Sequence, residues 1–160
     1  ADPFANTEST ENVSTALFGA RDATDLNWVQ LLNSYSCTEC GRCSSVCPAN
    51  QTGKLLSPRK VMMDTRDRIE DIGNNKNEGK FLLGDYISNE ELWACTTCNA
   101  CTDACPINLD PMSIIVDLRR YLVMEQSSAP TELNNMFSNI ENNGAPWQFP
   151  AADRLKWIEE

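Results

Sequence analysis

Eight cysteines are the residues of this chain whose type and spacing could do chemistry. They form two groups of four, and a proline directly follows each group: Cys37, Cys40, Cys43 and Cys47, then Cys95, Cys98, Cys101 and Cys105. Both groups have the form C-x2-C-x2-C-x3-C-P. Three thiolates spaced by three residues lie around one tight turn and can bind three irons of a cubane, while the fourth lies on the next segment. The duplicated motif therefore predicts two 4Fe-4S clusters.

The fourth cysteine of each motif is expected to bind the cluster of the other motif, as in two-cluster proteins with this spacing. The expected ligands of cluster one are Cys37, Cys40, Cys43 and Cys105. The expected ligands of cluster two are Cys95, Cys98, Cys101 and Cys47. Each half of the protein would then depend on the other half for folding, because each cluster takes one ligand from it.

Two other uses of the cysteines remain open. Small secreted proteins that depend on disulfides are usually denser in cysteine than this chain. Zinc sites with four cysteines usually contain paired C-x2-C knuckles separated by a longer loop, whereas here a third cysteine follows at once. Both alternatives fit the spacing less well than two iron-sulfur clusters do.

The composition excludes several other kinds of chemistry. The chain has no histidine, so it contains no Ser/His/Asp or Cys/His catalytic group, no histidine zinc ligand and no axial histidine for haem. The formal charge is -10, from 13 Lys and Arg against 23 Asp and Glu, which argues against nucleic acid as a partner. No apolar run is long enough to span a bilayer.

The internal repeat extends beyond the cysteines. An aromatic residue precedes each first cysteine by two positions, and an N-cap residue followed by proline comes after each motif, at Ser57-Pro58 and Asp110-Pro111. Steps of three and four then place two matching sets of side chains on one helix face each: Val61, Met62, Thr65 and Ile69, and Ile114, Ile115, Leu118 and Leu122. We therefore expect a duplicated unit of one cluster and one helix, with a pseudo-twofold axis.

Further helices are predicted at 26–34, at 90–94 and at 131–142. Ser88 and Glu91 form a capping box for the second of these, and Gly144 closes the third. Strand signals are scarce, so the predicted fold class is all-α. The polar segment 71–80, which contains two glycines, is typical of an exposed loop between the halves.

The chain is predicted to have three parts. Residues 1–24 are polar and patternless and are expected to form a mostly flexible arm. Residues 25–126 are expected to form the two-cluster domain. Residues 127–160 are expected to form a helical extension, truncated from a longer chain. Its aromatic residues Trp147, Phe149 and Trp157 would either fold back on the domain or form an interface with a larger partner.

The segments YSCTECGRCSSVCPAN and LWACTTCNACTDACPINLDP resemble the α-helical ferredoxin domain, over residues 26–125 or so. That domain occurs in the C subunits of heterodisulfide reductase and of anaerobic glycerol-3-phosphate dehydrogenase, and in related 4Fe-4S dicluster proteins. The resemblance implies an all-α fold, two 4Fe-4S clusters and electron transfer. It implies a relay within a larger oxidoreductase complex, between a flavoprotein dehydrogenase or other redox subunit and a quinone or disulfide acceptor.

The resemblance also implies a setting for the domain. Many relatives carry membrane helices ahead of it and Cys-Cys-Gly domains behind it, so we expect a cytoplasmic protein or one held at the cytoplasmic face of the membrane through segments absent from this chain. This sequence contains no Cys-Cys-Gly, and it is expected to be an electron-transfer domain without a catalytic site of its own. The alternative function is an iron-sulfur sensor or a structural module that relays no electrons.

Charged residues near the motifs predict that the two clusters differ in potential. Arg42, Lys54, Arg59 and Lys60 outnumber Glu39 around the first motif, whereas acidic residues flank the second. Positive charge favours a reduced cluster, so Arg42 is predicted to raise the potential of cluster one. The alternative is that these are solvated surface charges, screened within a Debye length of about 8 to 10 Å.

Overall fold

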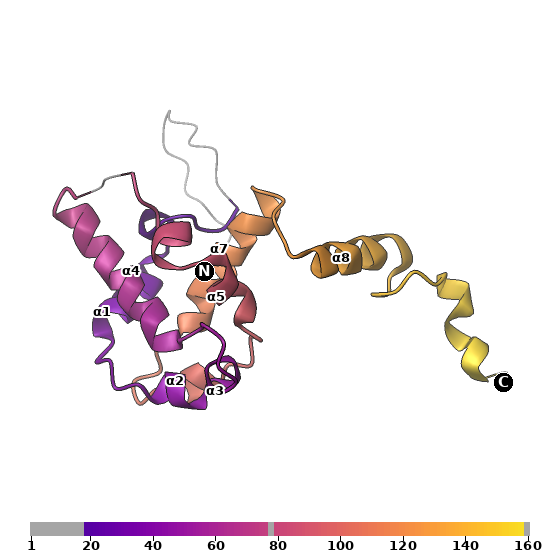
Figure 1. Cartoon of the computed structure of the whole chain (residues 1–160), viewed down its shortest axis with the longest axis horizontal. Coiled ribbons are helices and arrows are strands. Elements are labelled where there is room, and N and C mark those ends of the chain that lie inside the picture. Colours follow the sequence, from indigo (N-terminus) through magenta and orange to yellow (C-terminus); the bar gives the residue numbers. More distant parts are fainter. Residues whose placement is uncertain (1–17, 77–78, 159–160) are drawn as a thin grey trace, which may run out of the picture.

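The computed structural model describes residues 18–76 and 79–158, apart from two side chains at 151 and 154. Helices dominate this part of the chain (Figure 1), and the only β pairing in it is an isolated bridge between Leu83 and Ile87. The predicted all-α class is therefore confirmed. The elements in chain order are η1 (Ala23–Asp25), α1 (Trp28–Ser36), α2 (Arg42–Val46), α3 (Pro48–Gln51), α4 (Pro58–Gly73), η2 (Leu82–Tyr86), α5 (Asn89–Ala94), α6 (Ala100–Asp103), α7 (Pro111–Met124), α8 (Thr131–Asn143) and η3 (Ala151–Ile158).

The two long helices after the cysteine motifs begin as the sequence predicts. The Ser57 hydroxyl accepts the backbone N–H of Lys60 at 3.4 Å, and the Asp110 carboxylate accepts that of Met112 at 3.0 Å. Proline occupies the first helical position in both, where its missing N–H costs nothing. Helices α4 and α7 pack against each other, and so do α2 and α6. Matching elements of the two repeats therefore meet, as a pseudo-twofold arrangement requires.

The predicted inner faces of α4 and α7 form much of the core. Every member of the α7 set is buried, and so are Val61, Met62 and Thr65 of the α4 set, while Ile69 is only half-buried. The buried Thr65 hydroxyl donates to the carbonyl of Val61 at 2.8 Å, so its polar atom does not lose a partner on burial. Burying each large apolar side chain of these faces stabilises the fold by about 1.5–3 kcal/mol.

The other predicted helices are present with small shifts in their ends. Helix α1 begins after Asn27, whose side chain accepts two backbone N–H groups, so it starts later than the predicted 26–34 and runs on to Ser36. The Ser88–Glu91 capping box precedes α5, and Gly144 closes α8 with a φ of 64°. Helix α4 continues to Gly73, so the predicted loop 71–80 is helical at its start.

Residues 18–24 differ from the expected flexible arm. The arm's first residues, 1–17, lie outside the described residues, but Ala20 and Ala23 are buried against the helices. The Ala20 N–H donates to the carbonyl of Asp117 at 3.0 Å. Gly19 has a φ of 88°, and a Cβ there would lie 2.4 Å from the same carbonyl oxygen. The sequence does not predict this packing, because the segment contributes small side chains and backbone contacts. These produce no hydrophobic periodicity in the sequence.

A buried ion pair fixes this segment to α4. Arg68 is 1% exposed, and its Nε and Nη2 donate to the two carboxylate oxygens of Asp22 at 2.8 and 2.6 Å. The same carboxylate accepts the backbone N–H groups of Ala23 at 2.9 Å and Leu82 at 3.0 Å. Burial raises the pKa of Asp22, but these hydrogen bonds and the Arg68 charge outweigh it, so the pKa lies below its ordinary value.

The C-terminal part extends away from the helical body, as Figure 1 shows for α8 and the last helical turn. Helix α8 buries no residue, and two of its apolar side chains, Phe137 and Ile140, are exposed. Trp147, Phe149 and Trp157 are exposed as well. These aromatic side chains therefore do not pack into the core of the domain.

Candidate metal centre

Each cysteine motif begins where a helix ends. Helix α1 ends at Cys37, whose N–H donates to the carbonyl of Ser34 at 3.4 Å, and α5 ends at Cys95, whose N–H donates to that of Leu92 at 3.3 Å. The helices hold the first cysteine of each motif in a fixed place. The chain then leaves the helix and turns, which allows the following cysteines to approach the first.

The turns have the same backbone conformation in both motifs. Residues two and four positions after the first cysteine have positive φ, at Glu39 (59°) and Gly41 (81°), and at Thr97 (53°) and Asn99 (63°). Positive φ is uncommon for Glu and Thr. Such alternation curls the chain tightly and makes concave groups of N–H donors that suit anions, and the N–H of Thr97 donates to the sulfur of Cys95 at 3.4 Å. The sequence repeat is therefore a repeat of structure.

The first cavity of the site gathers thiols from both motifs. It is lined by Cys37, Cys40 and Cys43 of the first motif and by Cys101 and Cys105 of the second. Apolar side chains such as Met62 of α4 and Leu109 also line it, together with the charged residues Glu39 and Arg59. The chain thus brings the four cysteines predicted for cluster one to one place.

The second cavity has the reverse composition. It is lined by Cys95, Cys98 and Cys101 of the second motif and by Cys47 of the first, with Leu56, Met112 and Ile115 among its apolar neighbours. Cys101 lines both cavities, so the two are neighbours. Among the described residues, no three cysteine or acidic side chains converge on a single-ion site. Four thiols around one apolar cavity are the donor set that a cubane cluster needs, because its irons sit at separate corners.

Comparison with known proteins identifies the kind of domain. Residues 36–109 match the model of the 4Fe-4S dicluster domain. The chain contains a 4Fe-4S dicluster domain. It therefore binds two 4Fe-4S clusters, as the cysteine spacing predicts, and such clusters can accept and release single electrons.

Several curated proteins are similar to this chain. A probable iron-sulfur-binding oxidoreductase of Bacillus subtilis, FadF, is 32% identical over 89% of this chain and 25% of its own length. An EtfAB:quinone oxidoreductase of Syntrophomonas wolfei is 31% identical over 99% of this chain and 26% of its own. The C subunit of a ferredoxin:CoB-CoM heterodisulfide reductase of Methanosarcina mazei is 32% identical over 62% of this chain and 52% of its own. The chain thus spans about a quarter of the length of the first two relatives.

The predicted resemblance to the C subunit of heterodisulfide reductase is confirmed by this similarity.

In the part of the chain that the structure describes, no helix combines the length and apolar character that crossing a membrane requires.

The thiols of the dicluster domain differ in how readily they ionise. Burial raises the pKa of Cys101 to about 11 and also raises the pKa of Cys43. The exposed Cys98 has a lowered pKa because the backbone N–H of Ala100 and the hydroxyl of Thr96 stabilise its thiolate. Cluster iron binds thiolates, so assembly must remove protons from these two partly buried thiols, and binding is linked to proton release.

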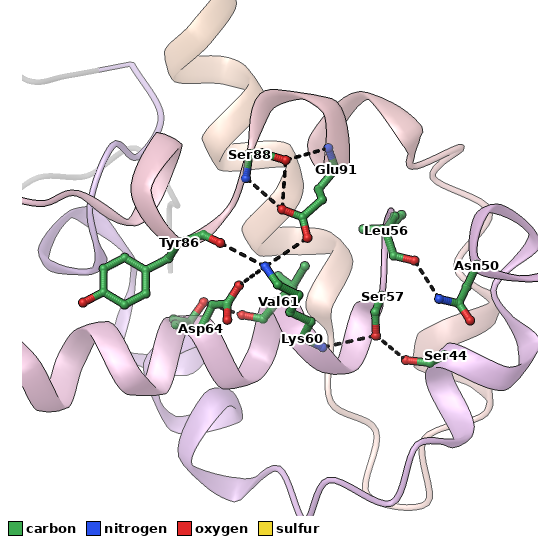
Figure 2. Close-up of polar contacts among 11 residues, drawn as sticks. Ser44, Asn50, Leu56, Ser57, Lys60, Val61, Asp64, Tyr86, Ser88 and Glu91 are labelled. Carbon is green, nitrogen blue, oxygen red and sulfur yellow. Dashed lines mark hydrogen bonds and ion pairs between the residues drawn. The ribbon is translucent and has the colours of Figure 1, made fainter. Parts of the chain in front are cut away.

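Polar contacts tie the first motif to the start of α4, as Figure 2 shows. The hydroxyls of Ser44 and Ser57 share a hydrogen bond of 2.7 Å, and the side-chain amide of Asn50 donates to the carbonyl of Leu56 at 3.1 Å. Ser44 lies between Cys43 and Cys47 in sequence. The N-cap residue of α4 therefore helps to orient the segment that carries thiols to both cavities.

Lys60 joins α4 to α5 and so links the two halves (Figure 2). Its Nζ lies 2.6 Å from the Asp64 carboxylate and 3.0 Å from that of Glu91, and it donates to the carbonyl of Tyr86 at 3.0 Å. Glu91 also accepts the N–H of Ser88 at 2.9 Å within the α5 capping box. Burial lowers the pKa of Lys60, but hydrogen bonds to the two carboxylates raise it more.

Replacing Lys60 with methionine is expected to lower stability, because the half-buried Asp64 and the buried Glu91 then lose the cation between their carboxylates. The Lys60 side chain is 45% exposed, and solvent screening limits the loss to about 1 kcal/mol. For a chain of this size that loss lowers the Tm by about 2–4 °C. Thermal unfolding of anaerobic holoprotein measures it, with Lys54→Met as the control at an exposed lysine. Equal Tm values for the two variants would contradict the role of the Lys60 contacts.

Proposed function

We propose that the two cavities are the two cluster sites and that the clusters are cross-ligated. Cluster one is held by Cys37, Cys40, Cys43 and Cys105. Cluster two is held by Cys95, Cys98, Cys101 and Cys47. The lining of the two cavities supports this assignment, because Cys105 joins the first three cysteines of the first motif and Cys47 joins the first three of the second, while Cys101 also reaches the first cavity.

We further propose that the domain relays electrons within a larger oxidoreductase complex, from a flavoprotein dehydrogenase to a quinone or disulfide acceptor. The observation that carries this proposal is the adjacency of the two cavities, which share Cys101. Neighbouring clusters can pass an electron between them without leaving the protein. Each cavity also has one exposed cysteine, Cys40 and Cys98, where the cluster comes nearest to a partner.

The names of the relatives support the kind of partner. The name of the Syntrophomonas wolfei relative includes a quinone, and that of the Methanosarcina mazei relative includes a heterodisulfide. Respiratory quinones dissolve in the bilayer, so a quinone acceptor favours a domain at the cytoplasmic face of the membrane. In this proposal residues 127–160 form a helical extension of the domain, directed toward the rest of the complex.

Rapid reversible electron exchange tests the relay. Reconstituted holoprotein is mixed anaerobically with reduced flavin mononucleotide as donor and then with menadione as acceptor, and cluster absorbance is followed by stopped flow. The relay predicts that both clusters are reduced and reoxidised repeatedly with no loss of iron. Slow exchange, or cluster loss within one cycle, would instead favour the iron-sulfur sensor or structural module.

A further inference from the structure

Arg119 of α7 binds the segment that carries the first cysteine of the second motif. Its Nε donates to the carbonyl of Leu92 at 3.0 Å, and its Nη2 donates to that carbonyl and, at 2.6 Å, to the carbonyl of Cys95. Its guanidinium also lies over the ring of Trp93, 5.0 Å from the ring centre. One side chain outside the cysteine motif therefore holds the chain on both sides of Trp93.

These contacts fix the place from which Cys95 reaches the second cavity. Leu92 is in the last turn of α5, at the negative end of the helix dipole, and a cation there is favourable. Partners behind a metal ligand set its orientation. Arg119 is therefore placed to hold the Cys95 sulfur in a constant position when the cluster changes its oxidation state.

Arg119 also brings a positive charge to the backbone of Cys95, although it does not line the cavity itself. Its side chain is half-buried, and none of the ion pairs found among the described residues involves it. Reduction adds one electron and thus one negative charge to a cluster, without making or breaking a bond. A nearby cation that solvent screens only partly favours the reduced form.

The equivalent arginine of the first repeat is placed differently. Asp64-x-Arg66 in α4 matches Asp117-x-Arg119 in α7. Arg66, however, is paired with a carboxylate: its Nη2 lies 2.6 Å from Glu39, which is in the turn between Cys37 and Cys40. The positive charge of Arg66 is therefore neutralised at the first motif.

We propose that Arg119 is a positioning residue for cluster two and raises its reduction potential through its charge, whereas Arg66 does not do so for cluster one. The inference rests on the proposed ligand sets, in which Cys95 binds cluster two. The effect of Arg42 on cluster one stays a separate prediction; its side chain is exposed, where salt screens its charge.

Redox titration of reconstituted holoprotein, followed by electron paramagnetic resonance, tests the proposal with matched variants. Arg119→Gln removes the charge and is expected to lower the potential of one cluster only. Arg119→Lys keeps the charge and is expected to keep that potential close to wild type. Arg66→Gln removes the same formal charge at the equivalent position and is expected to leave the cluster that responds to Arg119 unchanged.

A fourth variant keeps every Arg119 contact. Val123 lies one turn after Arg119 on α7, and the two residues line one groove with Trp93, so Val123→Glu places a carboxylate beside the guanidinium. It is expected to lower the potential of the same cluster. It therefore tests the effect of charge even if the Arg119→Gln protein does not assemble that cluster.

Unchanged potentials in both Arg119→Gln and Val123→Glu would overturn the proposal, and so would equal shifts in Arg119→Gln and Arg119→Lys. Failure of the proposed function is visible separately, because wild-type protein would then not hold two clusters or would not exchange electrons.

Discussion

Replacing Cys47 with serine is expected to remove the cluster bound by Cys95, Cys98 and Cys101 and to leave the other cluster in place. Cys47 precedes α3 in the first motif, yet it lines the cavity of the second motif and not that of its sequence neighbours. A serine hydroxyl is a poor ligand for cluster iron, so one iron of the cluster loses its thiolate ligand. Iron content should fall from about eight to about four per chain.

Alkylation of free thiols under anaerobic conditions, read by mass spectrometry, identifies which cluster is lost. In Cys47→Ser, Cys95, Cys98 and Cys101 should become labelled, and the four proposed ligands of cluster one should stay protected. Cys105→Ser is the matched control and should give the reverse pattern. Labelling of Cys37, Cys40 and Cys43 in Cys47→Ser would mean that each motif binds its own cluster.

Replacing Asp22 with alanine is expected to destabilise the domain more than replacing any exposed residue does. The change leaves the guanidinium of Arg68, which is 1% exposed, without its carboxylate, and it removes the acceptor of the Leu82 N–H. Breaking a buried pair from one side costs about 3–5 kcal/mol. The Tm of holoprotein should therefore fall by roughly 10 °C.

Two further measurements separate this ion pair from other effects. The double variant Asp22→Leu with Arg68→Met removes both charges and should recover much of the lost Tm. The pKa of Asp22 is lowered in the folded state, so its contribution is full above its ordinary pKa of about 4. That contribution is lost as the pH falls through the lower folded value. A single variant that unfolds at the wild-type temperature, or a double variant no better than the single one, would refute this role.

The features that could be predicted are those encoded within a few residues of each other. The cysteine spacing indicated the cofactor, and Ser57-Pro58 and Asp110-Pro111 indicated the starts of α4 and α7, because a cap and its helix are adjacent in sequence. The inner faces followed from helical periodicity. Ile69 is only half-buried, and it is the member of its set nearest the C-terminal end of α4.

The features that could not be predicted depend on pairs far apart in the chain. Arg68 meets Asp22 across 46 positions, and Arg119 meets Cys95 across 24. Neither basic residue lies in a motif. Lys60 is close in sequence to the first motif, yet it pairs with Glu91 of the second half. The distance in sequence between a charged residue and a cysteine motif is therefore a poor guide to the electrostatic field at a cluster.

Iron, acid-labile sulfide and zinc per chain, measured on anaerobically reconstituted protein, test the central claim most directly. Two cubane clusters in the two cavities predict about eight iron and eight sulfide, with no zinc. About two zinc and no sulfide would instead mean a structural zinc module with four thiolates for each metal. That result would contradict the dicluster account and, with it, the electron relay.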